Sequence, residues 1–187
     1  AVADLQMPVI QKLRELKLRV VAVNPRTLDE VFRAIQVIGD ACGANAAARR
    51  TVDGLKARVA AVESKTAVTP ADSRPRVFVE IWNDPLMTAG AGTFVDDLVR
   101  RAGGRNVVGH IDGWPQISPE TVISAHTDVV ILTCFNRAEV MARHEWRKVP
   151  AIVQGRVFEV HPDLMVRPGP RLVDGLETLA GLFAGAQ

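Results

Sequence analysis

The chain has 187 residues, of which 48% are hydrophobic and 24% are charged, and its net charge is +2 at pH 7. This composition is typical of a globular protein and argues against a nucleic-acid-binding protein, which would carry a clustered basic face. No apolar run reaches the roughly 18 residues of a transmembrane helix, the first residues predict no signal peptide, and Cys42 and Cys134 form no CxxC pair.

Residues 1–43 are predicted to form a helix, a strand and a second helix. Apolar spacing predicts a short amphipathic helix over 9–16, and the run LRVVAV predicts a buried strand over 18–23. A capping box begins the next helix, which Gly43 ends. The residues of that box are Thr27 and Glu30, and the inner face of the helix is predicted to comprise Leu28, Val31, Ile35 and Ile38. Because a two-sided sheet needs neighbouring strands, we expect 1–43 to be the remnant of an amino-terminal α/β lobe.

Residues 44–75 are predicted to form a long helix followed by a linker. The helix extends over about 44–64, where a stripe at three- and four-residue spacing comprises Val52, Leu55, Val59 and Val62. The polar, proline-containing stretch 66–75 then predicts a linker. A long helix that leads into a linker and a new strand is suited to joining two lobes rigidly.

Residues 76–187 are predicted to form a complete second α/β lobe. Its strands are expected over 76–82, 106–108, 128–132 and 157–160. They alternate with helices over 93–102, from Ser118 onward, over 138–148 and over 171–184. This alternation of strands and helices predicts a mostly parallel sheet.

No catalytic signature is present in the sequence. It contains no GxSxG, Walker loop or HExxH, and Gly90-Ala91-Gly92 lacks the third glycine of a dinucleotide fingerprint. The four histidines have no metal-ligand spacing. An enzyme on a doubly wound fold would need a nucleophile or a phosphate loop, so we expect a protein without enzymatic activity.

Three loops are expected where the parallel strands end, which is where open α/β sheets bind ligands. The first loop (82–92) offers Trp82, Asn83, Asp84 and Met87. The second loop (111–116) offers Trp114 and Gln116, and the third loop (161–171) offers Asp163, Leu164, Met165 and Arg167. Indoles and thioethers give broad apolar contact, and a few polar groups fix orientation. The three loops together predict a ligand site, although each aromatic residue alone, Trp82 in particular, is equally compatible with a core position.

At these residues the sequence resembles the periplasmic substrate-binding proteins of the cobalamin and iron-chelate ABC importers, in the vitamin B12-binding branch. The resemblance covers essentially the whole chain, and the segments that carry it are 20–39, 44–64, EIWNDPLMTAG (80–90), TFVDDLVRRAGGRNV (93–107), WPQIS with Glu120 (114–120) and PDLMVRPGPR (162–171). It implies a two-lobed class III binding protein with one long interlobe helix, an incomplete amino-terminal lobe and a complete carboxyl-terminal lobe.

The resemblance also implies a function. It suggests an exported, extracytoplasmic protein that binds cobalamin, without a catalytic cofactor, and delivers it to the permease of an ABC importer. Any membrane anchor would belong to a segment outside this sequence. Position in the family makes Met87, Trp114, Asp163 and Arg167 ligand-contacting, and makes Glu120 a contact for basic residues of the permease. A carboxylate near a helix start also has a simpler role, which is to complement the helix dipole.

The sequence leaves two alternatives open. A ferric siderophore or haem is the first alternative to cobalamin, although the absence of Tyr argues mildly against a haem-tyrosinate site in this chain. The second alternative is a structural or self-associating remnant that binds no ligand, in which two incomplete lobes cover exposed sheet edges.

Overall fold

The computed structural model describes residues 2–185 and contains a main sheet of four strands in the order β4-β1-β5-β6. The strands are β1 (Arg76–Glu80), β4 (Arg105–Asn106), β5 (Val129–Leu132) and β6 (Val157–Glu159). All three pairings are parallel, and β5 bonds to β1 on one side and to β6 on the other. The prediction of a mostly parallel sheet is confirmed.

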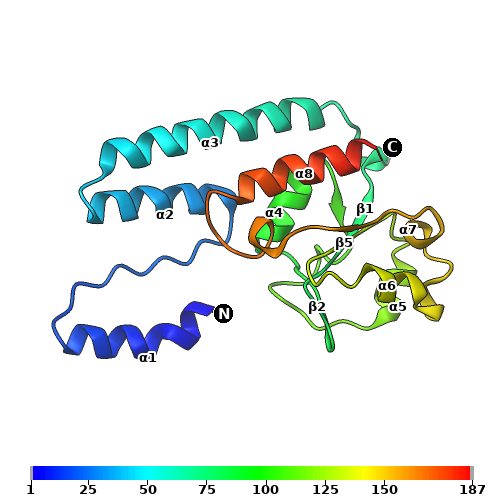
Figure 1. The fold of residues 1–187 in the computed structure, drawn as a ribbon, viewed down its shortest axis with the longest axis horizontal. Helices are drawn as coiled ribbons and strands as arrows, with labels where there is room; N and C mark the ends of the chain where they lie inside the picture. The colour runs from blue at the N-terminus through cyan, green and yellow to red at the C-terminus, as the bar shows by residue number, and fades with distance from the viewer. Residues whose placement is uncertain (1, 186–187) are drawn as a thin grey trace.

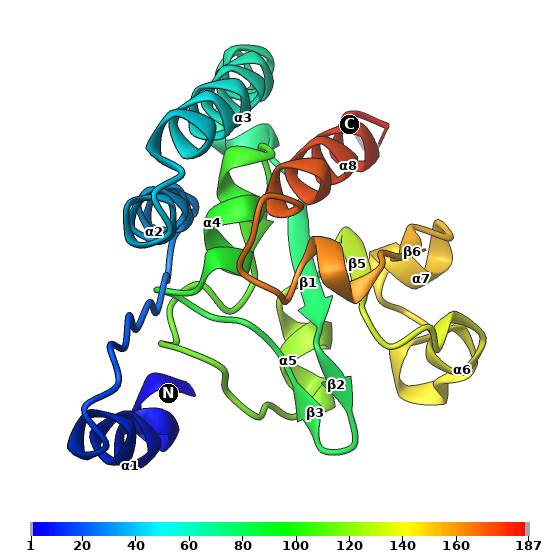
Figure 2. The ribbon, with the colours of Figure 1, turned by 60° about the vertical axis from the view of Figure 1, so that its left-hand side comes forward.

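Helices cover both faces of this sheet (Figure 2). On one face lie α4 (Phe94–Arg101) and α8 (Leu172–Ala184). The other face carries four short helices, α5 (Pro119–Ser124), α6 (Arg137–Ala142), η2 (His144–Trp146) and α7 (Pro150–Val153). Because successive strand residues point to opposite faces, Val77 and Val79 join the α4 and α8 core while Phe78 joins the other.

The helices α2 (Leu28–Ala41) and α3 (Asn45–Thr66) lie side by side and share the core of α4 and α8 (Figure 1). The Thr27 half of the predicted capping box is present, because Thr27 Oγ1 accepts a hydrogen bond from the Glu30 amide at 3.2 Å. The Glu30 carboxylate accepts a hydrogen bond from the Arg26 amide at 2.6 Å, one residue before the Thr27 amide that a capping box uses. Gly43 ends α2 with a φ of +69°, which favours glycine. The predicted stripe of α3 is buried: Val52, Leu55, Val59 and Val62.

The predicted inner face of α2 is wrong at one position. Leu28 and Val31 are buried as predicted, whereas Ile38 is 48% exposed and Phe32 is buried instead. Near this end of α2 the contact with α3 passes through Gly39, where a Cβ atom would come within 2.3 Å of the Ala48 Cβ. The close approach of Gly39 and Ala48 leaves Ile38 on the outside.

The strand predicted over 18–23 is absent. A helix, α1 (Val2–Glu15), begins earlier than predicted, and the chain then extends to Thr27 without a strand partner among residues 2–185. Leu18, Val21 and Val23 are 54%, 52% and 43% exposed. In Figures 1 and 2 this stretch runs from α1, which stands apart, to the start of α2. A strand is stabilised by its neighbours, and apolar residues alone cannot replace the missing ladder.

Two other predicted segments differ from the structure in detail. The helix predicted over 138–148 ends as α6 at Ala142, and η2 follows after Arg143, which is extended with φ −62° and ψ 108°. This break lets the Arg143 side chain reach the end of β1, as described below. The predicted linker 66–75 contains the single 3-10 turn η1 (Ala71–Ser73).

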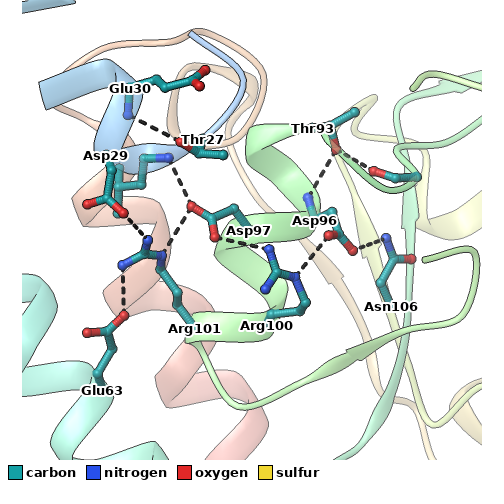
Figure 3. Close-up of polar contacts among 12 residues, drawn as sticks. Thr27, Asp29, Glu30, Glu63, Thr93, Asp96, Asp97, Arg100, Arg101 and Asn106 are labelled. Carbon is teal, nitrogen blue, oxygen red and sulfur yellow. Dashed lines mark hydrogen bonds and ion pairs between the residues drawn. The ribbon is translucent and has the colours of Figure 1, made fainter. Parts of the chain in front are cut away.

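Charged side chains of α4 join this helix to α2 and α3 (Figure 3). The Arg101 guanidinium donates to Asp29 at 2.6 Å, Glu63 at 2.8 Å and Asp97 at 3.1 Å. Asp97, which is 5% exposed, also accepts a hydrogen bond from the Leu28 amide at 2.9 Å. These two bonds fall on one oxygen of Asp97, and the other oxygen accepts a hydrogen bond from Arg100 at 3.2 Å. The buried carboxylate is thus satisfied, and α2, α3 and α4 are held in one fixed arrangement.

Candidate ligand-binding edge

The carboxyl edge, where β1, β5 and β6 end, carries the first loop as a short antiparallel hairpin of β2 (Trp82–Asn83) and β3 (Leu86–Met87). Leu86 is buried and fixes the hairpin to the core. Trp82 is 55% exposed, and its indole Nε1 donates to the Asp84 carbonyl at 2.7 Å. Asp84 is exposed and Met87 is half-buried. The hairpin therefore presents an indole and a carboxylate to solvent, and Trp82 is not a core residue.

The second loop lies directly beside this hairpin. The Thr88 amide donates to the Pro115 carbonyl at 3.1 Å, the Ile117 amide donates to the Leu86 carbonyl at 3.0 Å, and Met87 forms a β-bridge with Gln116. Trp114 is half-buried, and its ring centroid lies 5.5 Å from that of Phe94 in an edge-to-face arrangement. The first two predicted loops are thus brought together by backbone bonds.

Side chains at the end of β4 and at the cap of α4 bond to the backbone of the first loop (Figure 3). Asn106 donates to the Ala89 carbonyl at 2.8 Å and to Asp96 at 2.9 Å, and Thr93 Oγ1 donates to the Gly90 carbonyl at 2.8 Å. At Gly90 a Cβ atom would come within 1.9 Å of the Ile111 carbonyl oxygen, so only glycine fits where the first two loops touch.

The third loop begins with η3 (Pro162–Leu164) and holds an ion cluster. Asp163 pairs with Arg167 and with Arg171, each at 2.9 Å, and its side chain is 21% exposed. Arg167 is 75% exposed, so most of its guanidinium faces solvent. The prediction that Met165 contacts the ligand is wrong. Met165 is 0% exposed and belongs to the core that includes the residues of α8.

The loop after β5 connects the first loop to the third. Cys134 Sγ donates to the Ile81 carbonyl at 3.1 Å, and the Phe135 ring lies edge-to-face with His161 at 5.9 Å between centroids. Among the residues that the structure describes, no hydrogen bond or ion pair joins Asp163 or Arg167 to the indoles of Trp82 and Trp114. The three loops share one edge, with the loop after β5 between them.

A buried ion pair at this edge was missed by the sequence analysis. Glu80, at the end of β1, is fully buried, and it accepts hydrogen bonds from Arg143 at 2.8 Å and from Asn136 at 2.6 Å. The Arg143 guanidinium carbon lies 4.6 Å from the centroid of Trp146. A charged residue in the predicted strand was the one available signal, because a buried carboxylate requires a partner that sequence cannot locate.

Glu120, the predicted permease contact, lies elsewhere, in the first turn of α5. It is exposed, and its pKa is lowered because the carboxylate accepts hydrogen bonds from its own backbone amide and from the Ser118 hydroxyl. The helix begins at the predicted Ser118, but the Ser118 side chain makes no cap bond to a backbone amide. Glu120 therefore stays anionic near neutral pH.

The described residues contain no group of three His, Cys, Asp or Glu side chains arranged to hold a metal. None of the helices between residues 2 and 185 has the length and apolar character needed to cross a bilayer. Both cysteines are free. A hollow of about 560 Å³ between α3 and α8, lined in part by Val62, Lys65 and Phe183, lies away from the carboxyl edge.

Comparison with known proteins identifies the family. The profile described as periplasmic binding protein matches residues 6–164, which is most of the chain. The chain belongs to the periplasmic binding protein family. Its class III α/β architecture agrees with solved members of that family, as the structural comparisons below indicate.

Two curated relatives of this periplasmic binding protein are each 30% identical to it. One is an ABC transporter substrate-binding lipoprotein of Bacillus subtilis, aligned over 91% of this chain and 55% of the relative. The other is a cobalamin-binding protein of Halobacterium salinarum, aligned over 93% of this chain and 49% of the relative. The chain thus spans about half the length of the curated relatives that it matches.

Solved structures of periplasmic binding proteins share the fold. The heme-binding protein from a Roseiflexus species has a TM-score of 0.85 at 22% identity, and the match covers 96% of this chain and 72% of that protein. The vitamin B12-binding protein of Vibrio cholerae has a TM-score of 0.82 at 22% identity, with coverages of 96% and 70%. At such identities the likeness establishes the fold and leaves the ligand open.

Proposed function

We propose that this chain is part of the extracytoplasmic substrate-binding component of an ABC importer and that its ligand is cobalamin. The observation that carries the proposal is the carboxyl edge, where an exposed indole, a half-buried indole and a solvent-facing guanidinium lie on three loops of the same edge. The 30% identical relative named as a cobalamin-binding protein supports this choice of ligand. The chain would act by binding and release, without a catalytic residue or cofactor.

The first two loops would contact the apolar part of the ligand. Trp82 and Trp114 offer flat indole surface, and Met87 offers a polarizable thioether that adapts to an irregular ring. Asp84, exposed beside the Trp82 indole, would accept hydrogen bonds from ligand amides. These contacts suit a large macrocycle that carries amide side chains around its rim.

The third loop would contact the polar groups of the ligand. Both carboxylate oxygens of Asp163 are already occupied by Arg167 and Arg171. Asp163 therefore orients Arg167 more than it contacts the ligand itself. The exposed Arg167 guanidinium keeps N–H donors free for a phosphate or amide oxygen of the ligand.

The lobe organisation and the partner complete the proposal. Residues 1–43 would belong to the amino-terminal lobe, 44–75 would be the interlobe helix and linker, and 76–187 would be the carboxyl-terminal lobe. Glu120, exposed and anionic, would pair with basic residues of the permease at the membrane surface. The protein would work outside the cytoplasmic membrane, held there by a segment beyond this sequence if it is anchored.

Equilibrium dialysis of the chain against cyanocobalamin tests the ligand, with a ferric hydroxamate siderophore and haemin in parallel. We expect retention of cyanocobalamin and a loss of about 1 kcal/mol or more, about five-fold in affinity, in Trp114→Ala. Val153→Ala, at an exposed apolar position on α7, is the control and should bind like the parent. If the chain retains only the siderophore or haemin, the assignment of cobalamin as the ligand is wrong. If it retains none of the three compounds, the proposed function is contradicted.

A further inference from the structure

Two large aromatic side chains are exposed at the same edge of the sheet. Among the described Phe and Trp residues, only Trp82 and Phe135 are more than half exposed, at 55% and 56%. Trp82 follows β1, and Phe135 follows β5, its neighbour in the sheet. The Cys134 thiol bonds the Ile81 carbonyl at 3.1 Å, so the residues preceding these two aromatics are in direct contact.

The backbone at Phe135 is in an unusual conformation. Its φ of +52° lies in the left-handed region, which residues with a Cβ atom rarely adopt. The neighbours impose this conformation, because Thr133 donates to the Glu80 carbonyl at 3.1 Å and Asn136 donates to the Glu80 carboxylate at 2.6 Å. Glycine would meet the same backbone demand without strain, so the aromatic ring is not there to satisfy the turn.

The Phe135 ring lies next to the polar group of the third loop. Its centroid is 5.9 Å from that of His161 in an edge-to-face arrangement. His161 is itself 60% exposed, and its Nδ1 accepts a hydrogen bond from the Asp163 amide at 3.2 Å. Phe135 thus stands between the hairpin that carries Trp82 and the loop that carries Asp163 and Arg167.

We propose that Phe135 is a ligand-contacting residue and that it widens the apolar surface of the site beyond the two indoles. The inference rests on the proposed function, since it assumes that the carboxyl edge receives the ligand. An exposed ring on a strained backbone gains stabilisation only when another apolar surface covers it. Trp82 and Phe135 on adjacent loops are suited to a wide ligand with apolar ring surface, such as a tetrapyrrole-like macrocycle.

The test separates a ligand contact from a structural role by measuring binding and stability together. Phe135→Gly removes the ring and relieves the left-handed strain, so we expect an affinity about five-fold or more lower, with a thermal midpoint equal to or above that of the parent. Phe135→Tyr keeps the ring and should bind within about two-fold of the parent. Binding is measured by dialysis of the full chain against cyanocobalamin and against haemin.

His126→Gly is the matched control, because His126 has a φ of +51° and precedes β5 at the opposite edge of the sheet. It should gain stability similarly and leave affinity unchanged. Unchanged affinity in Phe135→Gly, a fall in stability together with affinity, or an equal loss in His126→Gly would each overturn the inference. If the parent chain retains neither compound, the proposed function fails first and the inference fails with it.

Discussion

Two stretches of this chain have nearly the same apolar sequence and opposite structures. LRVVAV at 18–23 and DVVIL at 128–132 both predict a buried strand. Val129 to Leu132 are 0% exposed and form β5, with bonded strands on both sides. In the first stretch Leu18 and Val21 are more than half exposed, and none of the described residues pairs with it.

The difference between these stretches shows what a strand requires. Both stretches are rich in β-branched valine, which favours strands, yet residues 18–26 form neither helix nor strand. What β5 has in addition is a ladder on each side and helices over each face, which remove its apolar surface from water. A strand is therefore a property of its neighbours as much as of its own residues.

The largest expected effect comes from removing the ion pair between Arg143 and Glu80 at the end of β1, the strand that neighbours β5. Arg143→Ala leaves the fully buried Glu80 carboxylate without its cation, and should lower the free energy of unfolding by about 3–5 kcal/mol. Urea denaturation followed by circular dichroism measures this loss. Lys148→Ala, at a nearby exposed position, should change little. A loss under 1 kcal/mol in Arg143→Ala would mean that this pair does not hold the strand end.

The same substitution in both stretches tests the comparison directly. Val130→Ala removes two methyl groups from a fully buried site, and we expect a loss of about 2–3 kcal/mol in the free energy of unfolding. Val21→Ala, at a position 52% exposed, should change it by less than about 0.5 kcal/mol. Similar losses in both variants, by urea denaturation, would show that 18–23 is covered in solution.

Asp128, which directly precedes β5, makes the stability of this strand depend on pH. Burial alone would raise the pKa of Asp128, but hydrogen bonds from the Arg76 side chain and amide outweigh it and hold the pKa below its ordinary value. The folded state therefore binds this proton less readily than the unfolded state, so its contribution is present above about pH 5 and is lost as pH falls through the folded pKa.

Asp128→Asn should accordingly cost about 1–2 kcal/mol at pH 7, and the difference from the parent should shrink as the pH falls from about 5 to about 2. Urea denaturation at a series of pH values measures it. A difference that stays constant across this range would assign the effect to packing and not to the ionised carboxylate.

The smallest expected effect lies where the exposed stretch gives way to the core. Thr27→Ala removes the hydroxyl that accepts a hydrogen bond from the Glu30 amide and caps α2. We expect the free energy of unfolding, measured by urea denaturation, to fall by about 1 kcal/mol. Thr27→Ser retains the cap and should recover most of it. If the alanine variant matches the parent, the Glu30 carboxylate on the Arg26 amide is sufficient to begin the helix.

The candidate site was partly visible in the sequence. Turn residues after an apolar strand placed Trp82 and Asp84 on a loop, and the order of strands and helices placed Trp114 on a second loop at the same edge. The role of Met165 was misjudged because a methionine in a loop sequence can face either ligand or core. Phe135 was passed over because nothing in TCFNR indicates a left-handed, exposed residue.

The sequence by itself determined most of the long helices, the Thr27 cap, the parallel sheet and the resemblance to the family, because periodicity, capping residues and motif order are local properties of a chain. Only the tertiary structure decided which apolar stretch became a strand, where the buried Glu80 found Arg143, and which aromatic side chains remained exposed. These outcomes depend on contacts between residues distant in sequence, such as the 63 positions that separate Glu80 from Arg143, and such contacts leave no local pattern.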